Sequence, residues 1–469
     1  MTSGSNFWDY ELWSLLITLT VLLGGMLLAN VLRRKVSFIR KSLIPSSVLG
    51  GFIVLILSVV YQKITNRPLI ETSMLETLTY HGLGLGFVAI TLVENEKNKD
   101  KNRQRDIFNT GVTTVLTYLI QAVLGLVVTV ILYYAIGSFF ASGVILPLGF
   151  GQGPGQAFNW GSNYEKLYGF ENGTSFGLTI AALGFISASV GGVFYLNILR
   201  RKGIIQVAEC EVDSADDTVV CGENEIPSSE SMDKLTVQIA LVFVAYMAAY
   251  GIMMAFNVLI NTGILGNFGV NTLQPLIWGF NFLFGVLTAI LLKAVLKVLR
   301  KSGLMKRDYT NSFLQTRLSG FFFDIMVVAS IAAIDLSAFT TRKFIVPLIA
   351  VSVVGTVSTY LFLGRVAKDK FAAYQHEFWL SMYGMLTGTA STGIILLREA
   401  DPKFKTPAAT NLVYQNLYAM LFGFPIMLLL SFVPQSVTNT FITIGIFAAL
   451  FAVLLVLLYR DNIFKKKQK

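Results

Sequence analysis

Two glycine-rich stretches carry the polar residues that could bind a ligand. The first, residues 149–161 (GFGQGPGQAFNWG), has no charged side chain and lies between long apolar segments, and the second, residues 384–393 (GMLTGTASTG), is rich in hydroxyls. Glycine and proline at this density interrupt a helix, and interrupted backbone at membrane depth persists only where protein or a water-filled cavity satisfies it. Both stretches are therefore predicted to be helix breaks that form a binding site.

The chemistry available at these breaks is uncharged. Helix termini expose N–H groups that favour anions, unwound carbonyls can hold a sodium ion, and glycine lets a ligand approach the backbone. The candidate substrate- and ion-binding residues are Gly151, Gln152, Gly153, Pro154, Gly155, Gln156 and Asn159 in the first break, and Thr387, Gly388, Thr389, Ser391, Thr392 and Gly393 in the second. The alternative is that small residues and hydroxyls only permit close helix packing in lipid. Paired breaks at corresponding positions of two halves favour the site.

Four ionisable residues require separate interpretation. Asp324 lies well inside an apolar segment, where a carboxylate is costly; it is either an ion-binding candidate facing the bundle interior or a structurally paired carboxylate. Asp335 is expected at a solvated span end, and His81 at the membrane interface. Arg398 could meet a substrate carboxylate, or it belongs to a cytosolic basic cluster.

Composition indicates a polytopic membrane protein. The 469 residues are 54% hydrophobic and 14% charged, and apolar runs near the length of a membrane crossing recur. The net charge of +10 comes from basic clusters that flank apolar runs, so we expect no nucleic-acid partner. Cys210 and Cys221 lie in an acidic segment without a nearby histidine, and we interpret them as free cytosolic thiols. No cofactor is predicted.

Eleven apolar segments are predicted to cross the membrane. Five precede a polar linker, at about residues 12–32, 44–61, 75–93, 107–136 and 174–199; five follow it, at 234–262, 272–299, 314–336, 342–364 and 408–434; the last is at 438–460. The breaks, at about 143–168 and 375–398, occupy the same place in each half. If both breaks are re-entrant, the basic residues outside are Lys63, Arg67, Lys166, Arg342 and Lys343, and the rest of the 37 are inside, as the positive-inside rule requires.

The predicted fold class is therefore all-α, with two inverted-topology repeats of about five transmembrane helices, each with a re-entrant glycine-rich hairpin. The first repeat is residues 1–202 and the second is 234–434. An acidic cytosolic linker, 203–233, joins them, and 435–469 adds a C-terminal helix and a basic tail. The N-terminus is predicted outside and the C-terminus in the cytosol. An odd number of spans per repeat inverts the second repeat and places a site at the membrane midplane.

Two other functions were weighed against transport. A membrane-embedded enzyme acting on a lipid-linked substrate should show acid–base or metal-binding residues clustered at a membrane surface, whereas here the polar residues converge on uncharged breaks. We therefore expect no enzymatic activity. Residues 148–151 (LGFG) are similar to a potassium-channel filter, but such filters use four equivalent loops, and the second break has no such sequence.

Three short stretches resemble the bacterial sodium/glutamate symporter family. They are residues 37–45 (SFIRKSLIP) with Gly50-Gly51, similar to the stretch before the family's second span; residues 151–158 (GQGPGQAF) followed by 168–170 (YGF), similar to its first re-entrant motif; and residues 387–393 (TGTASTG), similar to its second. In layout the resemblance covers roughly residues 12–434. Where the family reads Gly-His-Gly-Thr-Gly, this chain has Gln152 and Pro154, which lack the imidazole and the hydroxyl.

The resemblance implies an activity and an assembly. It implies sodium-coupled uptake of glutamate or a related anionic amino acid or carboxylate across the cytoplasmic membrane. The re-entrant tips would meet at the substrate site, with sodium as the coupling ion, held by backbone carbonyls of the two breaks. It also implies a homodimer in which one part of each protomer moves against the rest.

Overall fold

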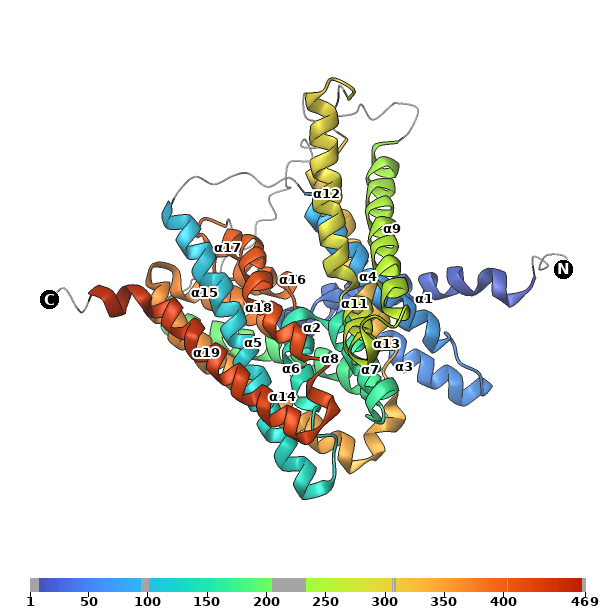
Figure 1. Ribbon diagram of the computed structural model, residues 1–469, viewed down its shortest axis with the longest axis horizontal. Helices are drawn as coiled ribbons and strands as arrows, with labels where there is room; N and C mark the ends of the chain where they lie inside the picture. The colour runs from blue at the N-terminus through green and yellow to red at the C-terminus, as the bar shows by residue number, and fades with distance from the viewer. Residues whose placement is uncertain are drawn as a thin grey trace. The chain divides into compact units, whose positions relative to one another are not determined.

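The computed structural model describes residues 8–93, 101–204 and 233–465, except residues 306, 308 and 403 (Figure 1). These residues form helices and connections without a strand, so the all-α prediction is confirmed for them. Most of the predicted linker, with Cys210 and Cys221, and the last lysines of the tail lie outside the described residues.

Within the described residues, ten segments are long and apolar enough to cross a membrane. They are α1 (Tyr10–Lys35), α3 (Ser46–Thr65), most of α5 (Lys101–Ile136), α8 (Gly173–Arg201), α9 (Lys234–Asn261), α12 (Asn281–Lys301), α13 (Ser312–Ala332), α14 (Arg342–Lys370), the segment Asn416–Gln435 that begins with α18 (Asn416–Leu429), and α19 (Val437–Lys465). The multi-pass character predicted from the sequence is thus supported.

The predicted segmentation needs two kinds of correction. The expected span at 75–93 forms α4 (Thr72–Leu92), which is long enough but falls outside the ten, because Glu76, His81 and its glycines make it less apolar. The expected spans at 272–299 and 408–434 are each interrupted. The first divides into α11 (Gln274–Gly279) and α12, since the backbone leaves the helical region at Phe280 (φ −109°, ψ 36°); the second divides into α17 (Ala408–Tyr414) and α18.

Short elements surround the two predicted breaks and connect the long helices. The first break comprises η1 (Ser142–Val144), α6 (Ile145–Pro147), the π-helical η2 (Leu148–Gln152) and α7 (Pro154–Tyr168); the second comprises η5 (Ala372–Tyr374), α15 (Gln375–Thr387) and α16 (Ala390–Arg398). The remaining short elements are α2 (Ser37–Lys41), α10 (Gly266–Phe268), η3 (Gly269–Leu273), η4 (Leu336–Thr340) and η6 (Val433–Gln435). A continuous helix is thus absent at both predicted breaks.

The chain forms two compact units, which are described separately. Unit 1 contains the described residues of Met1–Glu76, Asn98–Ala208 and Val328–Lys469, and unit 2 contains those of Thr77–Lys97 and Glu209–Val327. Both breaks lie in unit 1.

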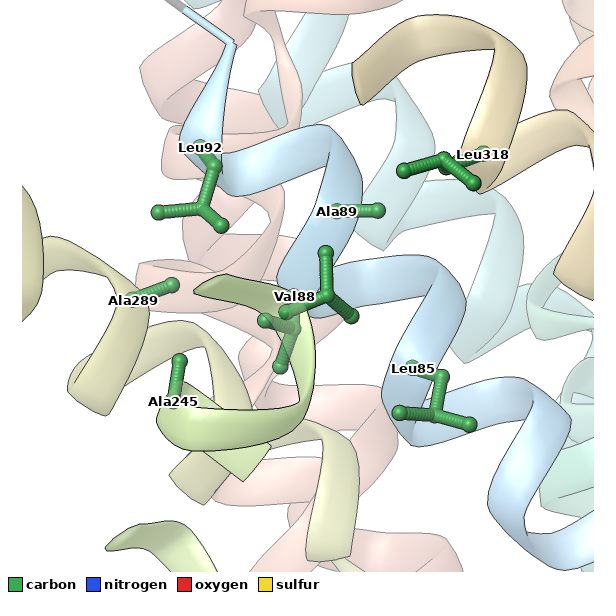
Figure 2. Packing of buried hydrophobic residues seen from close by; sticks show 8 residues of the cluster. Leu85, Val88, Ala89, Leu92, Ala245, Ala289 and Leu318 are labelled. Carbon is green, nitrogen blue, oxygen red and sulfur yellow. The ribbon is translucent and has the colours of Figure 1, made fainter. Parts of the chain in front are cut away.

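Helix α4 forms the centre of unit 2. Figure 2 shows Leu85, Val88, Ala89 and Leu92 on α4, packed with residues from three other helices: Ala245 of α9, Ala289 of α12 and Leu318 of α13. Glycines of α4 let aromatic rings approach, since a β-carbon on Gly84 would lie 2.4 Å from the Tyr246 ring. Lys293 caps the carboxyl end of α4 by donating to the carbonyls of Thr91 and Val93, at 3.1 and 2.7 Å.

Helices α5 and α8 form the frame of unit 1. Helix α5 packs along α14 and α19, as Figure 1 shows for α19, and α8 packs against α7 and α15. Buried threonines of α5 satisfy their hydroxyls inside the helix; Thr113 Oγ1 donates to Asn109 O at 2.7 Å, and Thr117 Oγ1 to Thr113 O at 2.8 Å. The helix can therefore carry hydroxyls through an apolar environment without leaving donors unsatisfied.

Candidate functional site

The first break turns at Gly153. This residue has φ 88° and ψ 177°, a backbone conformation that is essentially restricted to glycine. It ends the π-helix η2 and is the N-cap of α7, whose first residue is Pro154. Proline suits that position because its fixed φ is helical and the first helical residue needs no N–H. The sequence Gly-Pro therefore encodes this break locally.

The second break turns at Gly388 and Thr389, between α15 and α16. Thr389 is extended (φ −145°, ψ 170°) and is the N-cap of α16. The two helices of this hairpin approach closely, because a β-carbon on Gly393 would lie 2.4 Å from Ser381 O, and one on Gly384 would lie 2.7 Å from the Cα of Gly393. At Gly384 and Gly393 the close-packing interpretation therefore accounts for glycine.

The two breaks meet at the N-caps of their second helices. A β-carbon placed on Gly153 would lie 3.6 Å from Cγ2 of Thr389, which is van der Waals contact. Neither N-cap makes a side-chain hydrogen bond to the first turn of its helix. Helices α7 and α16 therefore begin side by side, and the positive ends of their dipoles favour an anion there.

One face of α5 holds a backbone carbonyl from each break. Tyr118 donates its hydroxyl to Gly151 O at 3.1 Å, and one turn later the Gln121 amide nitrogen donates to Leu386 O at 3.0 Å. The Gln121 amide also reaches Thr359 Oγ1 of α14 at 2.8 Å. The sequence analysis did not identify Tyr118 and Gln121, because it singled out only carboxylates, histidine and arginine within or beside the spans. A buried amide within an apolar span was the available signal.

Helix α8 lies against both breaks through small residues. A β-carbon on Gly177 would lie 2.1 Å from Ala157 O of α7, and one on Gly184 would lie 2.4 Å from Thr387 O of α15. Gly184 also faces the ring of Phe150 in η2, at 3.0 Å. Alanine at either glycine would force the breaks away from α8, so α8 and α5 together fix where the breaks sit in unit 1.

The candidate residues of the breaks differ in burial. Buried are Gly153, Pro154, Gly155, Gln156, Asn159, Thr387, Gly388, Thr392 and Gly393; partly buried are Gly151, Gln152 and Thr389; exposed is Ser391. The Thr387 hydroxyl donates to Tyr383 O at 2.7 Å, within its own helix. Thr389 and Thr392 place their hydroxyl oxygens 3.4 Å apart. The structure thus brings the two sets together but turns the Thr387 hydroxyl toward its own backbone.

Asp324 lies outside the unit that contains the two breaks. It is on α13 in unit 2, and its side chain is exposed in the described part of the chain. An ion-binding role of Asp324 stays a prediction.

The other ionisable residues have local roles. Asp335 is exposed and caps η4, accepting from Ser337 N at 2.8 Å, as expected of a solvated span end. His81 is exposed on α4, with Nδ1 3.0 Å from the Tyr246 hydroxyl oxygen. Arg398 is exposed at the end of α16, with its guanidinium over the Phe404 ring. Its contact therefore lies in the connection that follows the second break.

That connection is ordered by Asp401. The buried carboxylate accepts from Lys405 N at 2.9 Å, Thr406 N at 2.8 Å and Thr406 Oγ1 at 2.7 Å. Burial opposes ionisation, but these hydrogen bonds outweigh it and hold the pKa of Asp401 below its ordinary value. The charged carboxylate thus stabilises the chain between α16 and α17.

The assembled site consists of backbone dipoles, amides and hydroxyls. Within the described part of the chain, no group of three histidine, cysteine, aspartate or glutamate side chains is placed to hold a metal ion. No protein-family model matches the sequence, and no curated protein does. The geometry of the breaks suits two kinds of ligand. Helix N-termini favour an anion, and amide and carbonyl oxygens favour a cation or a hydrogen-bond donor.

Proposed function

We propose that this chain is a secondary active transporter that carries glutamate or a related anionic amino acid or carboxylate into the cell together with sodium. The observation that carries the proposal is the meeting of two helix N-termini, from segments far apart in the sequence, beside Gly153 and Thr389. Two helix N-termini that lie side by side favour a carboxylate, and broken helices are where such transporters bind their substrates.

The resemblance to the sodium/glutamate symporter family supports the choice of substrate and ion. The stretches that carry most of that resemblance, 151–158 and 387–393, are also the stretches that meet in unit 1. Under this proposal the sodium ion is held by carbonyls of the two breaks, and the protein is a homodimer in the cytoplasmic membrane.

The order of elements supports an inverted repeat and alternating access. In the first half α1 packs on α3, and in the second half α9 packs on α12, each pair within its own unit. Each half then continues through two further helices to a broken element. With the re-entrant topology that the basic residues favour, the first break is reached from outside and the second from the cytosol.

Reconstitution in liposomes tests the function directly. Purified protein should accumulate labelled glutamate only when sodium is higher outside, and collapse of that gradient by an ionophore should abolish accumulation. The accumulated label should be recovered as unchanged glutamate. Equal uptake with potassium in place of sodium would contradict sodium coupling, and a chemically altered product would favour the enzyme.

The topology is tested at two exposed glycines, Gly203 and Gly263. Among the described residues nothing lies within 4 Å of an added β-carbon at either, and their positive φ (69° and 80°) makes a substitution mildly strained. Single cysteines at these positions, with Cys210 and Cys221 replaced by serine, should react with an impermeant reagent from the cytosolic and the outer side respectively. Reaction of both from the same side would contradict the inverted repeat.

A further inference from the structure

A buried amide oxygen of α5 lies beside the second break. Gln121 is 0% exposed, and its amide nitrogen donates to Leu386 O and to Thr359 Oγ1. The orientation of the amide is fixed, because the Leu386 carbonyl can only accept a hydrogen bond. Its Oε1 is therefore turned away from Leu386, and among the described residues no donor is within hydrogen-bonding distance of that oxygen.

A second such oxygen belongs to the first break. Gln152 Oε1 is buried, and the described residues provide no donor for it either. Gln152 follows Gly151, whose carbonyl is held by Tyr118, and Tyr118 lies one turn from Gln121 on the same face of α5. The two unsatisfied oxygens thus belong to residues that make, or directly follow, the contacts between α5 and the breaks.

A third glutamine of unit 1 shows that burial need not leave an amide oxygen without a donor. Gln415, also 0% exposed, accepts from Thr114 Oγ1 with its Oε1 at 2.9 Å and donates to Asn416 Oδ1 at 2.9 Å. A buried acceptor without a donor is costly, and in a membrane helix it is costlier still. A cation or a hydrogen-bond donor, N–H or O–H, can satisfy it, whereas a second acceptor oxygen would be repelled.

We propose that Gln121 and Gln152 are side-chain ligands of a cation bound where the two breaks meet. The inference rests on the proposed function and deepens it, because it gives the coupling ion amide ligands in addition to backbone carbonyls. Neutral oxygens that replace a hydration shell suit a monovalent cation, and sodium is the ion that the proposed transport cycle provides. The shared chemistry also fits the ammonium group of an amino-acid substrate, and the experiment separates these two sources.

The test measures sodium binding to the purified, full-length protein without substrate. The melting temperature is followed as sodium chloride replaces choline chloride at constant ionic strength. Gln121→Leu and Gln152→Leu should each weaken the apparent affinity for sodium about tenfold. The matched control, Gln415→Leu, removes a satisfied amide and should leave the sodium affinity unchanged while lowering the melting temperature. If Gln121→Leu fails to fold, Gln152→Leu decides the outcome, because it leaves the hydrogen bond from the Gln121 amide to Leu386 O intact.

Each result has one meaning. Tenfold weaker sodium binding in the acceptor variants alone supports the assignment. Wild-type sodium affinity in Gln152→Leu overturns it and leaves the proposed symport standing. A wild-type protein that takes up glutamate without any response to sodium overturns both the assignment and sodium coupling. If the variants bind sodium normally but lose the preference for glutamate over glutarate, which lacks the ammonium group, the oxygens bind substrate and the cation assignment is wrong.

Discussion

The two breaks reach one place by different backbone chemistry. The first break unwinds through a π-helix and reverses at Gly153, whose positive φ admits glycine alone, and Pro154 starts the next helix. The second break keeps ordinary α-helix up to Thr387 and then needs only two non-helical residues, neither with positive φ, before α16 begins. The first break requires a positive φ, whereas in the second break Gly388 (φ −137°, ψ −103°) is closely surrounded.

This difference separates positions that look equivalent in the sequence. Gly153 and Gly388 are the glycines at which the two breaks turn, yet among the described residues a β-carbon at Gly153 meets only Thr389, at an ordinary 3.6 Å. A β-carbon at Gly388 meets Gly384 O at 3.0 Å, Thr392 Oγ1 at 3.1 Å and Phe185 at 3.2 Å. Alanine should therefore have unequal effects in the two breaks. At Gly153 it is limited by the backbone torsion angles, and at Gly388 by the neighbouring atoms.

The largest effect is expected from Gly153→Ala. Alanine cannot adopt φ 88° with ψ 177° without strain, so the mutation should cost about 3 kcal/mol and reorient the start of α7. We expect no measurable glutamate uptake in liposomes and a lower melting temperature.

The control for that mutation is Gly169→Ala, at the carboxyl end of α7. Gly169 also has a positive φ, 69°, but nothing lies within 4 Å of an added β-carbon. This variant should lose about 1 kcal/mol of stability, the usual cost of a left-handed non-glycine residue, and should retain uptake. Equal loss of uptake in both variants would mean that stability, and not the position of the helix N-terminus, limits transport.

A smaller effect is expected from Gly388→Ala. The new methyl group crowds the Gly384 carbonyl oxygen, the Thr392 hydroxyl and the Phe185 ring by a few tenths of an ångström. Overpacking of this kind should lower the free energy of unfolding by about 1–2 kcal/mol. Uptake should fall roughly tenfold, the change that 1.4 kcal/mol produces. A loss of uptake as complete as that of Gly153→Ala would show that Gly388 is also required for its backbone conformation. It would contradict the difference between the two breaks.

Tyr118→Phe tests the hydrogen bond between α5 and the first break. It removes the hydroxyl that donates to Gly151 O but keeps the ring that packs against Gly151. We expect a loss of about 1 kcal/mol in the free energy of unfolding and about fivefold weaker substrate binding, measured by thermal stability and by uptake at varied glutamate concentration. Unchanged substrate affinity would reduce the hydroxyl to a packing contact.

The all-helical fold could be predicted from the sequence because apolar run length and basic clusters are properties of single segments. The interruptions within the predicted spans could not be predicted in this way. Gln415 separates α17 from α18, yet no glycine or proline signals the division there. The helix face on which Asp324 lies could not be predicted for a related reason, since the register of a helix decides which face is exposed, and a helix that is apolar on most sides gives no clear register.

The breaks themselves could be predicted because glycine and proline act locally, whereas their partners could not. Tyr118 and Gln121 lie in a separate span, and their function depends on which carbonyls the fold brings to them. Nor does sequence show which hydroxyl of the second break is already used by its own helix, as the Thr387 hydroxyl is.

That distinction gives the smallest expected effect, from Thr387→Ala compared with Thr389→Ala. The Thr387 hydroxyl already donates to Tyr383 O at 2.7 Å, so its removal should change stability by no more than about 0.5 kcal/mol and leave glutamate affinity unchanged. The Thr389 hydroxyl lies at the N-cap of α16, with only the Thr392 oxygen at 3.4 Å, and its loss should weaken substrate binding by about 1 kcal/mol. Affinities from substrate-concentration series in the same liposomes compare the two variants directly. The reverse order, with Thr387→Ala the more damaging to affinity, would mean that the last turn of α15, and not the N-cap of α16, faces the ligand.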